Sequence, residues 1–465
     1  MEVLLKTVQV ILALSLLVVV HEFGHFIFAR LFKTRVEKFY MFFNPKFSLA
    51  KFKKFDGCWH CLFFSRNEVE EWDAHPESTE FGIGWVPFGG YCAISGMIDE
   101  TTKKEDLAHE PQPWEFRTKP AWQRFFIMFG GVLFNFVLAA VLYSAILFSW
   151  GESYIKNEDA VYGIAVNDLS YEMGFRSGDH ILALDGKPVE NVASIQADII
   201  CDEVREVLVR RGSETMTIKI DPAYMPAMLK SPGMFDMAFP FVIAEVPEGS
   251  INEGVLHSGD VITYAEGAYG SAAQDIMKAF KKYPGEDIAI MLDRVGDDGE
   301  MMTGLEMGIQ IDSIGMIEVV LDTDLSKMFK VTEKKYGLLN CVPAGVSRMW
   351  GTITNYVKQL GLIFSPSTKA YQSVGSFIAI GRIFPSSWDW LRFWTICALL
   401  SIILGVMNLL PIPALDGGFI LFLIFEMITG HKPSDRFMSI AETIGIVLLC
   451  ALMLLAFGND IRSLF

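Results

Sequence analysis

The sequence predicts a multi-spanning α-helical membrane protein with two small α+β modules inserted between its second and third spans. Three observations support this fold class. Hydrophobic residues make up 51% of the 465 residues, and the mean hydropathy is +0.33. Four long stretches are nearly free of charge, and a Ser-Gly-Asp pattern occurs twice in an acidic block between the second and third stretches. This composition excludes disordered and low-complexity proteins, and an odd count of seven Cys argues against a disulfide framework.

The four apolar stretches are residues 3–20, 125–150, 393–425 and 443–459. A membrane-spanning helix needs about 20 apolar residues, and the first stretch reaches that length because it continues helically to Arg30. We therefore expect transmembrane elements at residues 1–35, 121–150, 389–430 and 436–460. The first stretch could instead be a cleaved signal peptide, but it lacks a small-residue cleavage site and runs directly into His21.

The charges of the loops predict the orientation. Residues 30–54 hold eight Lys and Arg against the single acid Glu37, and short basic loops stay in the cytoplasm. Both termini and the acidic block would then lie outside, and in a bacterium with two membranes this side is the periplasm. Residues 151–330 hold 32 of the 55 acidic residues but only 14 of the 39 basic ones. Because no basic stripe is present, we expect no nucleic-acid partner.

The acidic block contains an internal repeat. Residues 173–189 and 254–265 each carry a Gly, an apolar residue, Ser-Gly-Asp and then an apolar strand. A helix-like stretch and an alternating strand follow in both copies. Gly178 and Gly259 suit a turn that needs positive φ, and the Asp after each can accept N–H groups of that turn. The block therefore predicts two similar β-rich modules.

The candidate catalytic and metal-binding residues lie at the end of the first span, in the sequence His21-Glu22-Phe23-Gly24-His25. The two His are four residues apart, so both imidazoles face one side of a helix and could bind one Zn²⁺, with Glu22 beside them as a base. Zinc lowers the pKa of a bound water and makes hydroxide available at neutral pH. Ionisable groups at membrane depth are costly and usually functional. The alternative is a pair of interfacial His that face lipid headgroups.

A zinc site with two His needs a third protein ligand, commonly a carboxylate. Asp416 is the single charge in the third apolar stretch, shortly after Pro411 and Pro413. Prolines break a helix, and non-helical backbone at membrane depth is tolerated only inside protein or along a cavity. This segment should therefore unwind within the helix bundle and present Asp416 to the metal. The alternative is a kinked helix in which Asp416 pairs with Lys or Arg.

These features resemble the site-2 protease family of intramembrane zinc metalloproteases, and in particular its bacterial members with tandem PDZ domains. The resemblance covers almost the whole chain and rests on these segments: His21–His25, Pro87–Tyr91, Lys119–Arg124, Asn135, the repeated modules and Asp416–Gly418. It implies PDZ domains at 155–222 and 236–317, a cytoplasmic re-entrant β region at 36–120 and a helical connector at 318–388. One departure is Phe129-Gly130-Gly131, where relatives often carry Ala-Gly-Pro. We expect this departure not to contact the metal-binding residues.

The resemblance also implies residue roles and partners. His21, His25 and Asp416 would bind Zn²⁺, and Glu22 would be the general base. The residues that would contact the substrate are Asn408, Pro411, Pro413, Gly89 and Gly90. The substrates would be single-span membrane proteins in the lipid bilayer, such as anti-sigma factors already trimmed outside, or remnant signal peptides. The PDZ domains would bind peptide C-termini or strands, or would act only as a size filter.

Three other interpretations remain. Cys58, His60 and Cys61, with His75 nearby, could form a second metal site, but no second C-x-x-C pair follows, so free cytoplasmic thiols are the preferred interpretation. The chain could be a catalytically inactive relative that holds membrane proteins through its PDZ domains. It could also be a metal carrier, although carriers usually show inverted repeats and these spans show none. The intact set of His21, Glu22, His25 and Asp416 favours the protease.

Overall fold

The computed structural model describes residues 2–67, 69–87, 89–97, 110–231, 233–269, 272–296, 299–364 and 377–462. The chain divides into two compact units. The membrane unit comprises residues 1–151, 335–357 and 374–465, and the module unit comprises residues 152–334 and 358–373. The division falls within helix α9 (Leu338–Phe364).

The helices of the membrane unit outside α9 are α1 (Glu2–Leu31), the short α2 (Glu70–Asp73), α3 (Ala121–Ser149), α10 (Phe377–Ile383), α11 (Trp390–Leu409), α12 (Asp416–Thr429) and α13 (Asp435–Arg462). Among the described residues, four helices are long and apolar enough to cross a membrane, and they lie in α1, α3, α11 and α13. This number agrees with the four predicted spans. The third predicted stretch divides into α11 and α12 because residues 410–415, which include Pro411 and Pro413, are not helical.

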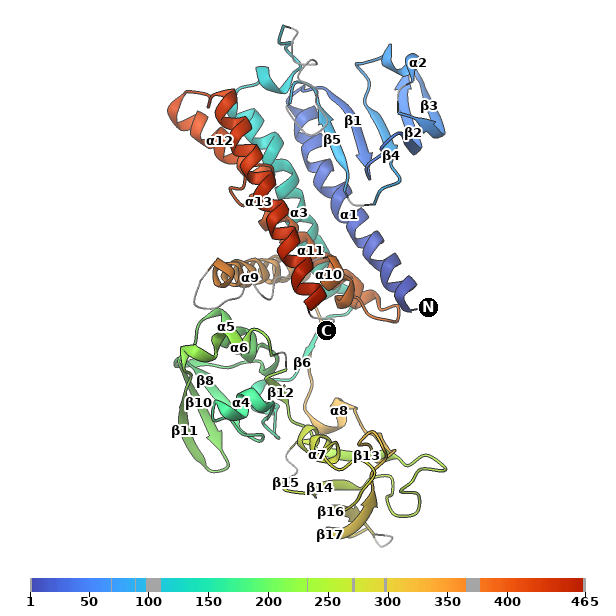
Figure 1. The fold of residues 1–465 in the computed structure, drawn as a ribbon, viewed down its shortest axis with the longest axis vertical. Helices are drawn as coiled ribbons and strands as arrows, with labels where there is room; N and C mark the ends of the chain where they lie inside the picture. The colour runs from blue at the N-terminus through green and yellow to red at the C-terminus, as the bar shows by residue number, and fades with distance from the viewer. Residues whose placement is uncertain are drawn as a thin grey trace. The chain divides into compact units, whose positions relative to one another are not determined.

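Helix α3 is the centre of the membrane unit, since it contacts α1, α11 and α12 (Figure 1). Its crossing with α1 is close because both helices carry Gly at the contact. A Cβ on Gly130 would lie 2.6 Å from the carbonyl oxygen of Gly24, so no larger residue fits without moving a backbone. This crossing places the α3 backbone beside the part of α1 that carries His21 and His25.

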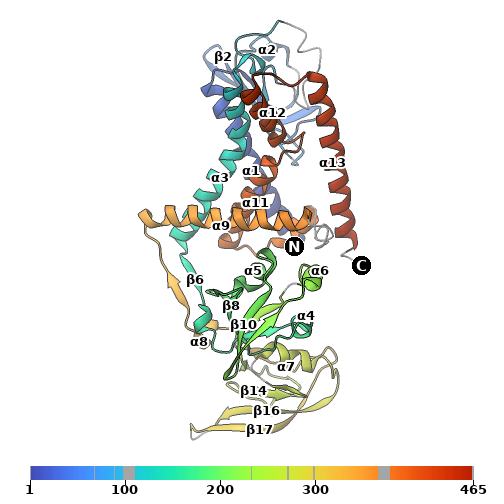
Figure 2. The same ribbon diagram turned by 90° about the vertical axis from the view of Figure 1, so that its left-hand side faces the viewer.

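A five-stranded sheet lies beside the C-terminal end of α1 in both views (Figure 1) and (Figure 2). Its strands are β1 (Val36–Met41), β2 (Phe47–Phe55), β3 (Cys58–Arg66), β4 (Glu80–Ile83) and β5 (Tyr91–Ile94), in the order β3-β2-β4-β1-β5. Strands β1 and β4 are parallel, and β5 pairs with β1 in antiparallel fashion. Strand β5 is therefore an edge strand, and it contacts α1. A 3₁₀ turn, η2 (Phe116–Thr118), precedes α3.

The module unit contains two β-rich modules, each with its own hydrophobic core. The first consists of η3 (Asn157–Asp159), β7 (Ile164–Val166), α4 (Asp168–Glu172), β8 (His180–Leu184), β9 (Lys187–Pro188), η4 (Val192–Ser194), α5 (Ile195–Cys201), β10 (Glu206–Arg211), β11 (Glu214–Lys219), η5 (Pro222–Tyr224), α6 (Met225–Met228) and β12 (Phe235–Met237). Its strands form the sheet β11-β10-β8-β9 and the pair β12-β7.

The second module consists of β13 (Phe241–Glu245), β14 (Val261–Ala265), β15 (Ala268–Tyr269), α7 (Ala273–Phe280), β16 (Asp287–Val295), β17 (Met301–Gln310) and β18 (Val320–Leu321). Its sheet has the order β17-β16-β14-β13-β18, with β15 paired to β14. After α8 (Leu325–Met328), β19 (Thr332–Lys334) pairs with β6 (Glu152–Tyr154). The first and last strands of residues 152–334 therefore form one two-stranded ribbon.

The repeated Ser-Gly-Asp turns have the same structure in both modules. Gly178 and Gly259 have φ of 89° and 91°, which agrees with the predicted turn. The following carboxylates, Asp179 and Asp260, are buried and each accepts an N–H from the residue three positions earlier. Each also pairs through two oxygens with an Arg of a later strand, Arg211 at the end of β10 and Arg294 on β16, a contact that sequence reasoning missed. In the second module, Arg294 lies 2.7 Å and 2.6 Å from the two oxygens of Asp260.

The predicted connector, residues 318–388, contains all of α9 and all of α10 as helices. The sequence also predicts a helix from residue 373 in the connector and one from Ser271 in the second module. Both of these starting positions lie outside the described residues.

Candidate active site

Two buried imidazoles lie one turn apart on the same face of α1. His21 and His25 are 9% and 7% exposed, and their Nε2 atoms lie 3.3 Å apart. The i, i+4 spacing on a continuous helix accounts for this arrangement. Both rings face α3, because Gly131 of that helix lies directly against them.

The expectation that the Phe129-Gly130-Gly131 segment would not contact the metal-binding candidates is wrong for Gly131. A Cβ at this position would lie 2.6 Å from Cε1 of His21 and would also overlap the His25 ring. The physical reason is the close crossing of α1 and α3 at Gly24 and Gly130, which the sequence does not reveal because these residues are far apart along the chain. Gly131 is therefore part of the wall that holds the two imidazoles.

Asp416 reaches the same point from the start of α12. It is the first residue of α12, directly after the non-helical residues 410–415. Ala414 in this break has φ of 82°, a strained value for a residue with a side chain. Gly418 packs onto the break, since a Cβ there would lie 2.6 Å from Cα of Pro413. The two Gly after Asp416 thus allow the chain to turn back tightly into α12.

The three side chains form a triangle with the dimensions of a zinc site. Oδ2 of Asp416 lies 3.2 Å from Nε2 of His21 and 3.3 Å from Nε2 of His25. Ligand atoms bound to a tetrahedral zinc at about 2.0–2.2 Å lie roughly 3.3–3.6 Å from one another. Oδ2 of Asp416 is also buried and has no hydrogen-bond partner. A bound cation would satisfy this oxygen. Two imidazoles and a carboxylate therefore fit Zn²⁺ in both geometry and donor type.

The outer nitrogen of each imidazole has its own contact. Nδ1 of His25 lies 2.9 Å from the carbonyl oxygen of Ile127, and Nδ1 of His21 lies 3.1 Å from the amide of Asn135. A His that binds metal through Nε2 carries its proton on Nδ1 and donates it. The Asn135 amide must then present its oxygen to His21, and this is the amide atom that otherwise has no partner. Sequence reasoning placed Asn135 in the second span without assigning it this contact.

Glu22 and the edge strand β5 line one cavity with the three candidate ligands. The cavity has a volume of about 240 Å³, and its lining includes His21, Glu22, His25, Asp416, and Gly90 to Cys92. The Glu22 carboxylate interacts with the backbone N–H of Cys92 on β5. A base, the candidate metal ligands and the edge of a β-sheet therefore meet at one place. This arrangement can bind an extended peptide and hydrolyse it.

Of the predicted substrate-binding residues, some lie at this cavity and others do not. The Asn408 amide lies 3.4 Å from Nε2 of His21, so Asn408 is part of the site. Gly90 lines the cavity and contacts Val18 of α1, whereas Gly89 packs against Phe43. The predicted substrate-binding prolines do not line the cavity, and Pro413 packs against Gly418 of α12 and Gly445 of α13. Phe88 lies outside the described residues.

The possible second metal site does not form among the described residues. Cys58 and Cys61 are exposed on β3, and the His60 ring stacks on Phe55 with a centroid distance of 3.8 Å. Within the described part of the chain, His21, His25 and Asp416 are the one group of three or more potential ligands close enough to share an ion.

Comparisons with known proteins support the same chemistry. The family model described as "Peptidase family M50" matches residues 9–66 and 68–452. The chain is 28% identical to the regulator of sigma-E protease RseP of Escherichia coli strain K12 over 98% of each chain. It is 26% identical to the protease RseP of Yersinia pestis over 100% of each chain, and 28% identical over 97% of each chain to a Xylella fastidiosa protein assigned to the zinc metalloproteases. The chain therefore belongs to peptidase family M50, the site-2 proteases, and is a zinc metalloprotease.

Proposed function

We propose that this enzyme hydrolyses peptide bonds within the transmembrane segments of single-span membrane proteins. The observation that carries the proposal is the cavity in which Glu22, the triangle of His21, His25 and Asp416, and the edge strand β5 come together. Its position at the end of a membrane-spanning helix supports a substrate that is itself in the membrane. Ionisable groups at membrane depth are costly and are usually retained for function.

In this proposal His21, His25 and Asp416 hold the zinc, and Glu22 moves the protons. Zinc supplies a Lewis acid that activates water and polarises the scissile carbonyl. Glu22 takes the proton from the attacking water and returns it to the leaving amine. Asn408 lies beside His21, where its amide can orient the bound peptide. Asn135 and the carbonyl of Ile127 orient the two imidazoles from behind.

The substrate has to be extended at the site, because a helical peptide bond is hydrogen-bonded and shielded by its neighbours. Among the described residues, β5 pairs with β1 as its one neighbouring strand, and its residues Tyr91, Cys92 and Ile94 line the cavity that contains Glu22. An unwound substrate segment can add to β5 as a further strand and gain main-chain hydrogen bonds. We propose that Gly90 and Gly89 shape the approach to β5, because Gly90 lines the cavity and packs closely against the Tyr40 carbonyl oxygen and Val18.

The repeated modules are proposed to be PDZ domains, at residues 155–222 and 236–317, on the periplasmic side of a bacterial inner membrane. Their shared Ser-Gly-Asp turn and separate cores support two copies of one fold. They would admit substrates whose outer domain has already been removed, such as trimmed anti-sigma factors or remnant signal peptides. The basic loop after α1 supports this orientation.

The test is cleavage of a single-span substrate that lacks its outer domain, by the full-length enzyme in detergent. We expect the parent to cut within the span, a chelator to abolish cleavage, and added zinc to restore it. Glu22→Gln should lose at least ~100-fold in rate while it retains zinc. Glu2→Gln is the matched control on the same helix, because Glu2 is exposed and distant from the cavity along α1. If neither parent nor variants cut any such substrate while zinc and fold are intact, the alternative of a PDZ-bearing holding protein is favoured.

A further inference from the structure

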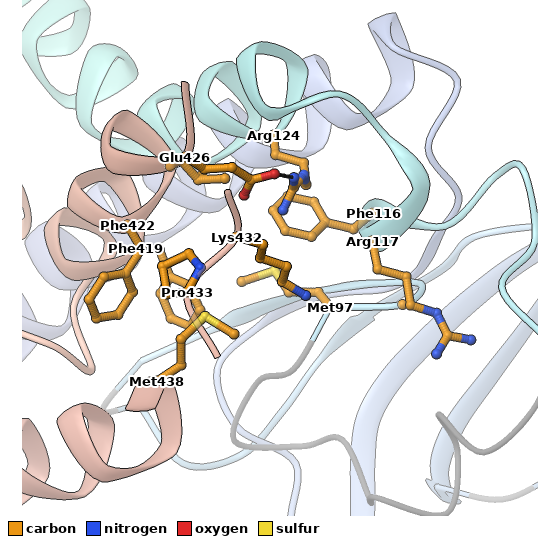
Figure 3. A pocket seen from close by; sticks show the side chains of 12 residues that line it. Met97, Phe116, Arg117, Arg124, Phe419, Phe422, Glu426, Lys432, Pro433 and Met438 are labelled. Atoms are coloured by element: carbon orange, nitrogen blue, oxygen red, sulfur yellow. Dashed lines mark hydrogen bonds and ion pairs between the residues drawn. The ribbon is translucent and has the colours of Figure 1, made fainter. Parts of the chain in front are cut away.

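Arg124 of α3 and Glu426 of α12 form an ion pair within the membrane unit (Figure 3). Arg124 is 7% exposed, and its Nε also donates to the carbonyl oxygen of Lys119, 2.9 Å away. The Glu426 side chain is 17% exposed. Burying two charges is costly unless they are paired and hydrogen-bonded, and neither residue takes part in the proposed cleavage chemistry. The position of the pair in the fold indicates what it does.

Helix α12 has a charged contact near each of its ends. At its start, Oδ2 of Asp416 lies 3.2 Å from His21 and 3.3 Å from His25, both on α1. Ten residues later, Glu426 pairs with α3. Ten residues cover about 15 Å along a helix axis, so the two carboxylates are too far apart to interact directly. Any influence of Glu426 on Asp416 therefore passes through the position of the helix itself.

The packing between these two contacts is one-sided. Ile420 and Leu423 are buried in a core cluster that includes residues of α3, whereas Phe419 and Phe422 line a cavity of about 330 Å³ (Figure 3). Side chains that border a cavity lack packing partners on that side, and apolar contacts are non-directional. Apolar packing therefore holds α12 against α3 but fixes its exact position only weakly. A hydrogen-bonded ion pair is directional and can fix it.

Helix α3 is also the support of the other two candidate zinc ligands. The carbonyl oxygen of Ile127 and the amide of Asn135 contact the outer nitrogens of the two imidazoles. Arg124 lies on the same helix, one turn before Ile127. The helix that orients both imidazoles thus also holds, through Arg124, the helix that carries Asp416. Metal ligands have to be placed to within about 0.5 Å, so a shared support of this kind matters for the site.

We infer that Arg124 and Glu426 are a positioning pair for the zinc site: by fixing α12 on α3, they place Asp416 against the two imidazoles. The inference rests on the proposed function, because it takes Asp416 as the third zinc ligand. The pair acts through Asp416 and contacts neither the three candidate ligands nor Glu22. Its loss should therefore change zinc affinity, zinc coordination and kcat, with little change in KM.

Two variants separate this role from a general effect on stability. Glu426→Gln keeps an oxygen that accepts from Arg124 but removes the counter-charge, so the protein should unfold at a lower temperature and bind zinc within about twofold of the parent. The double variant Arg124→Met with Glu426→Leu removes both charges, a change that is often neutral or stabilising. It should unfold like the parent but bind zinc about tenfold more weakly, because apolar substitutes lose a unique packing before they lose stability.

The measurements use the full-length enzyme in detergent. Competition with a chelator gives the zinc affinity, and the visible absorption of the enzyme loaded with Co²⁺ reports the ligand geometry without any cleavage assay. We expect an altered Co²⁺ spectrum and about a tenfold lower kcat in the double variant, and parental values in Glu426→Gln. Arg294→Met with Asp260→Leu is the matched control, since it removes a buried Arg–carboxylate pair from the second module; zinc affinity should not change.

Glu426→Leu alone gives a comparison that does not depend on the double variant folding. It leaves the Arg124 charge buried, as Glu426→Gln does, but it offers no acceptor, so it should bind zinc about tenfold more weakly than Glu426→Gln. Equal zinc affinities in these two variants, or a parental Co²⁺ spectrum and zinc affinity in a folded double variant, would overturn the inference and leave the pair a structural one. A parent enzyme that does not bind zinc through two imidazoles would instead contradict the proposed function.

Discussion

The amide of Asn135 on α3 lies 3.1 Å from Nδ1 of His21 on α1, while Nε2 of the same ring lies 3.2 Å from Asp416. Asn135 is fully buried, and its backbone oxygen accepts a hydrogen bond from Ser401 of α11. The ring orientation of His21 is thus determined by helices that are far apart in the sequence. Such outer contacts keep a metal-binding imidazole in the correct tautomer.

Asn135→Ala should weaken zinc binding about 10- to 100-fold, because His21 loses the acceptor for its Nδ1 proton. Asn135→Asp should retain most of the affinity, since a carboxylate also accepts that proton. Zinc retention against a competing chelator is the measurement, and Asn340→Ala, an exposed position on α9, is the control. Equal losses in the Ala and Asp variants would argue against this role for Asn135.

Gly131→Ala should disrupt the site although it adds only one methyl group. The new Cβ would overlap the His21 and His25 rings, and moving α3 away from α1 to relieve this overlap would break the close backbone packing at Gly24 and Gly130. We expect a loss of bound zinc and of cleavage by at least about tenfold. Gly351→Ala is the matched helical control, since nothing lies within 4 Å of its added Cβ; it should be neutral or stabilise by up to about 1 kcal/mol. Normal zinc content in Gly131→Ala would show that the helices separate more easily than this packing implies.

Much of this site could be predicted from the sequence, because its strongest signals are local. The spacing of His21 and His25 determines a shared helical face, and the charge of Asp416 stands out in an apolar stretch with two prolines. The position of α3 could not be predicted, because it depends on the contact between Gly24 and Gly130 across more than a hundred residues. For the same reason the sequence could not show that β1 and β4 are parallel and leave β5 at the edge.

Strand addition at β5 predicts that cleavage depends on the backbone N–H groups of the substrate. Synthetic substrates with one N-methylated peptide bond, placed two to four residues from the cut, should lose about tenfold in kcat/KM at alternate positions, because only alternate N–H groups of a strand point to its partner. Side chains are unchanged in this series, so each unmethylated peptide is its own control. A uniform effect at every position would indicate that the substrate binds without pairing to β5.

The buried pair of Arg294 and Asp260 predicts a large and local stability effect. Arg294→Met leaves a 1% exposed carboxylate without its bidentate partner, which typically costs about 3–5 kcal/mol. The double variant Arg294→Met with Asp260→Leu should recover part of that loss. Limited proteolysis of the second module in the full-length protein measures the effect, with Arg210→Met, an exposed residue of β10, as the control. Proteolysis rates equal to those of the parent would show that the pair contributes little.

The central claim is that His21, His25 and Asp416 share one zinc ion. The most direct measurement is zinc content together with X-ray absorption at the zinc edge, on the full-length parent and on Asp416→Asn and Glu22→Gln. We predict one zinc per chain in the parent with two imidazole nitrogens and oxygen ligands, the same zinc in Glu22→Gln, and at least a tenfold weaker site in Asp416→Asn. Full zinc binding with unchanged coordination in Asp416→Asn, or a zinc site without two imidazoles, would contradict the account.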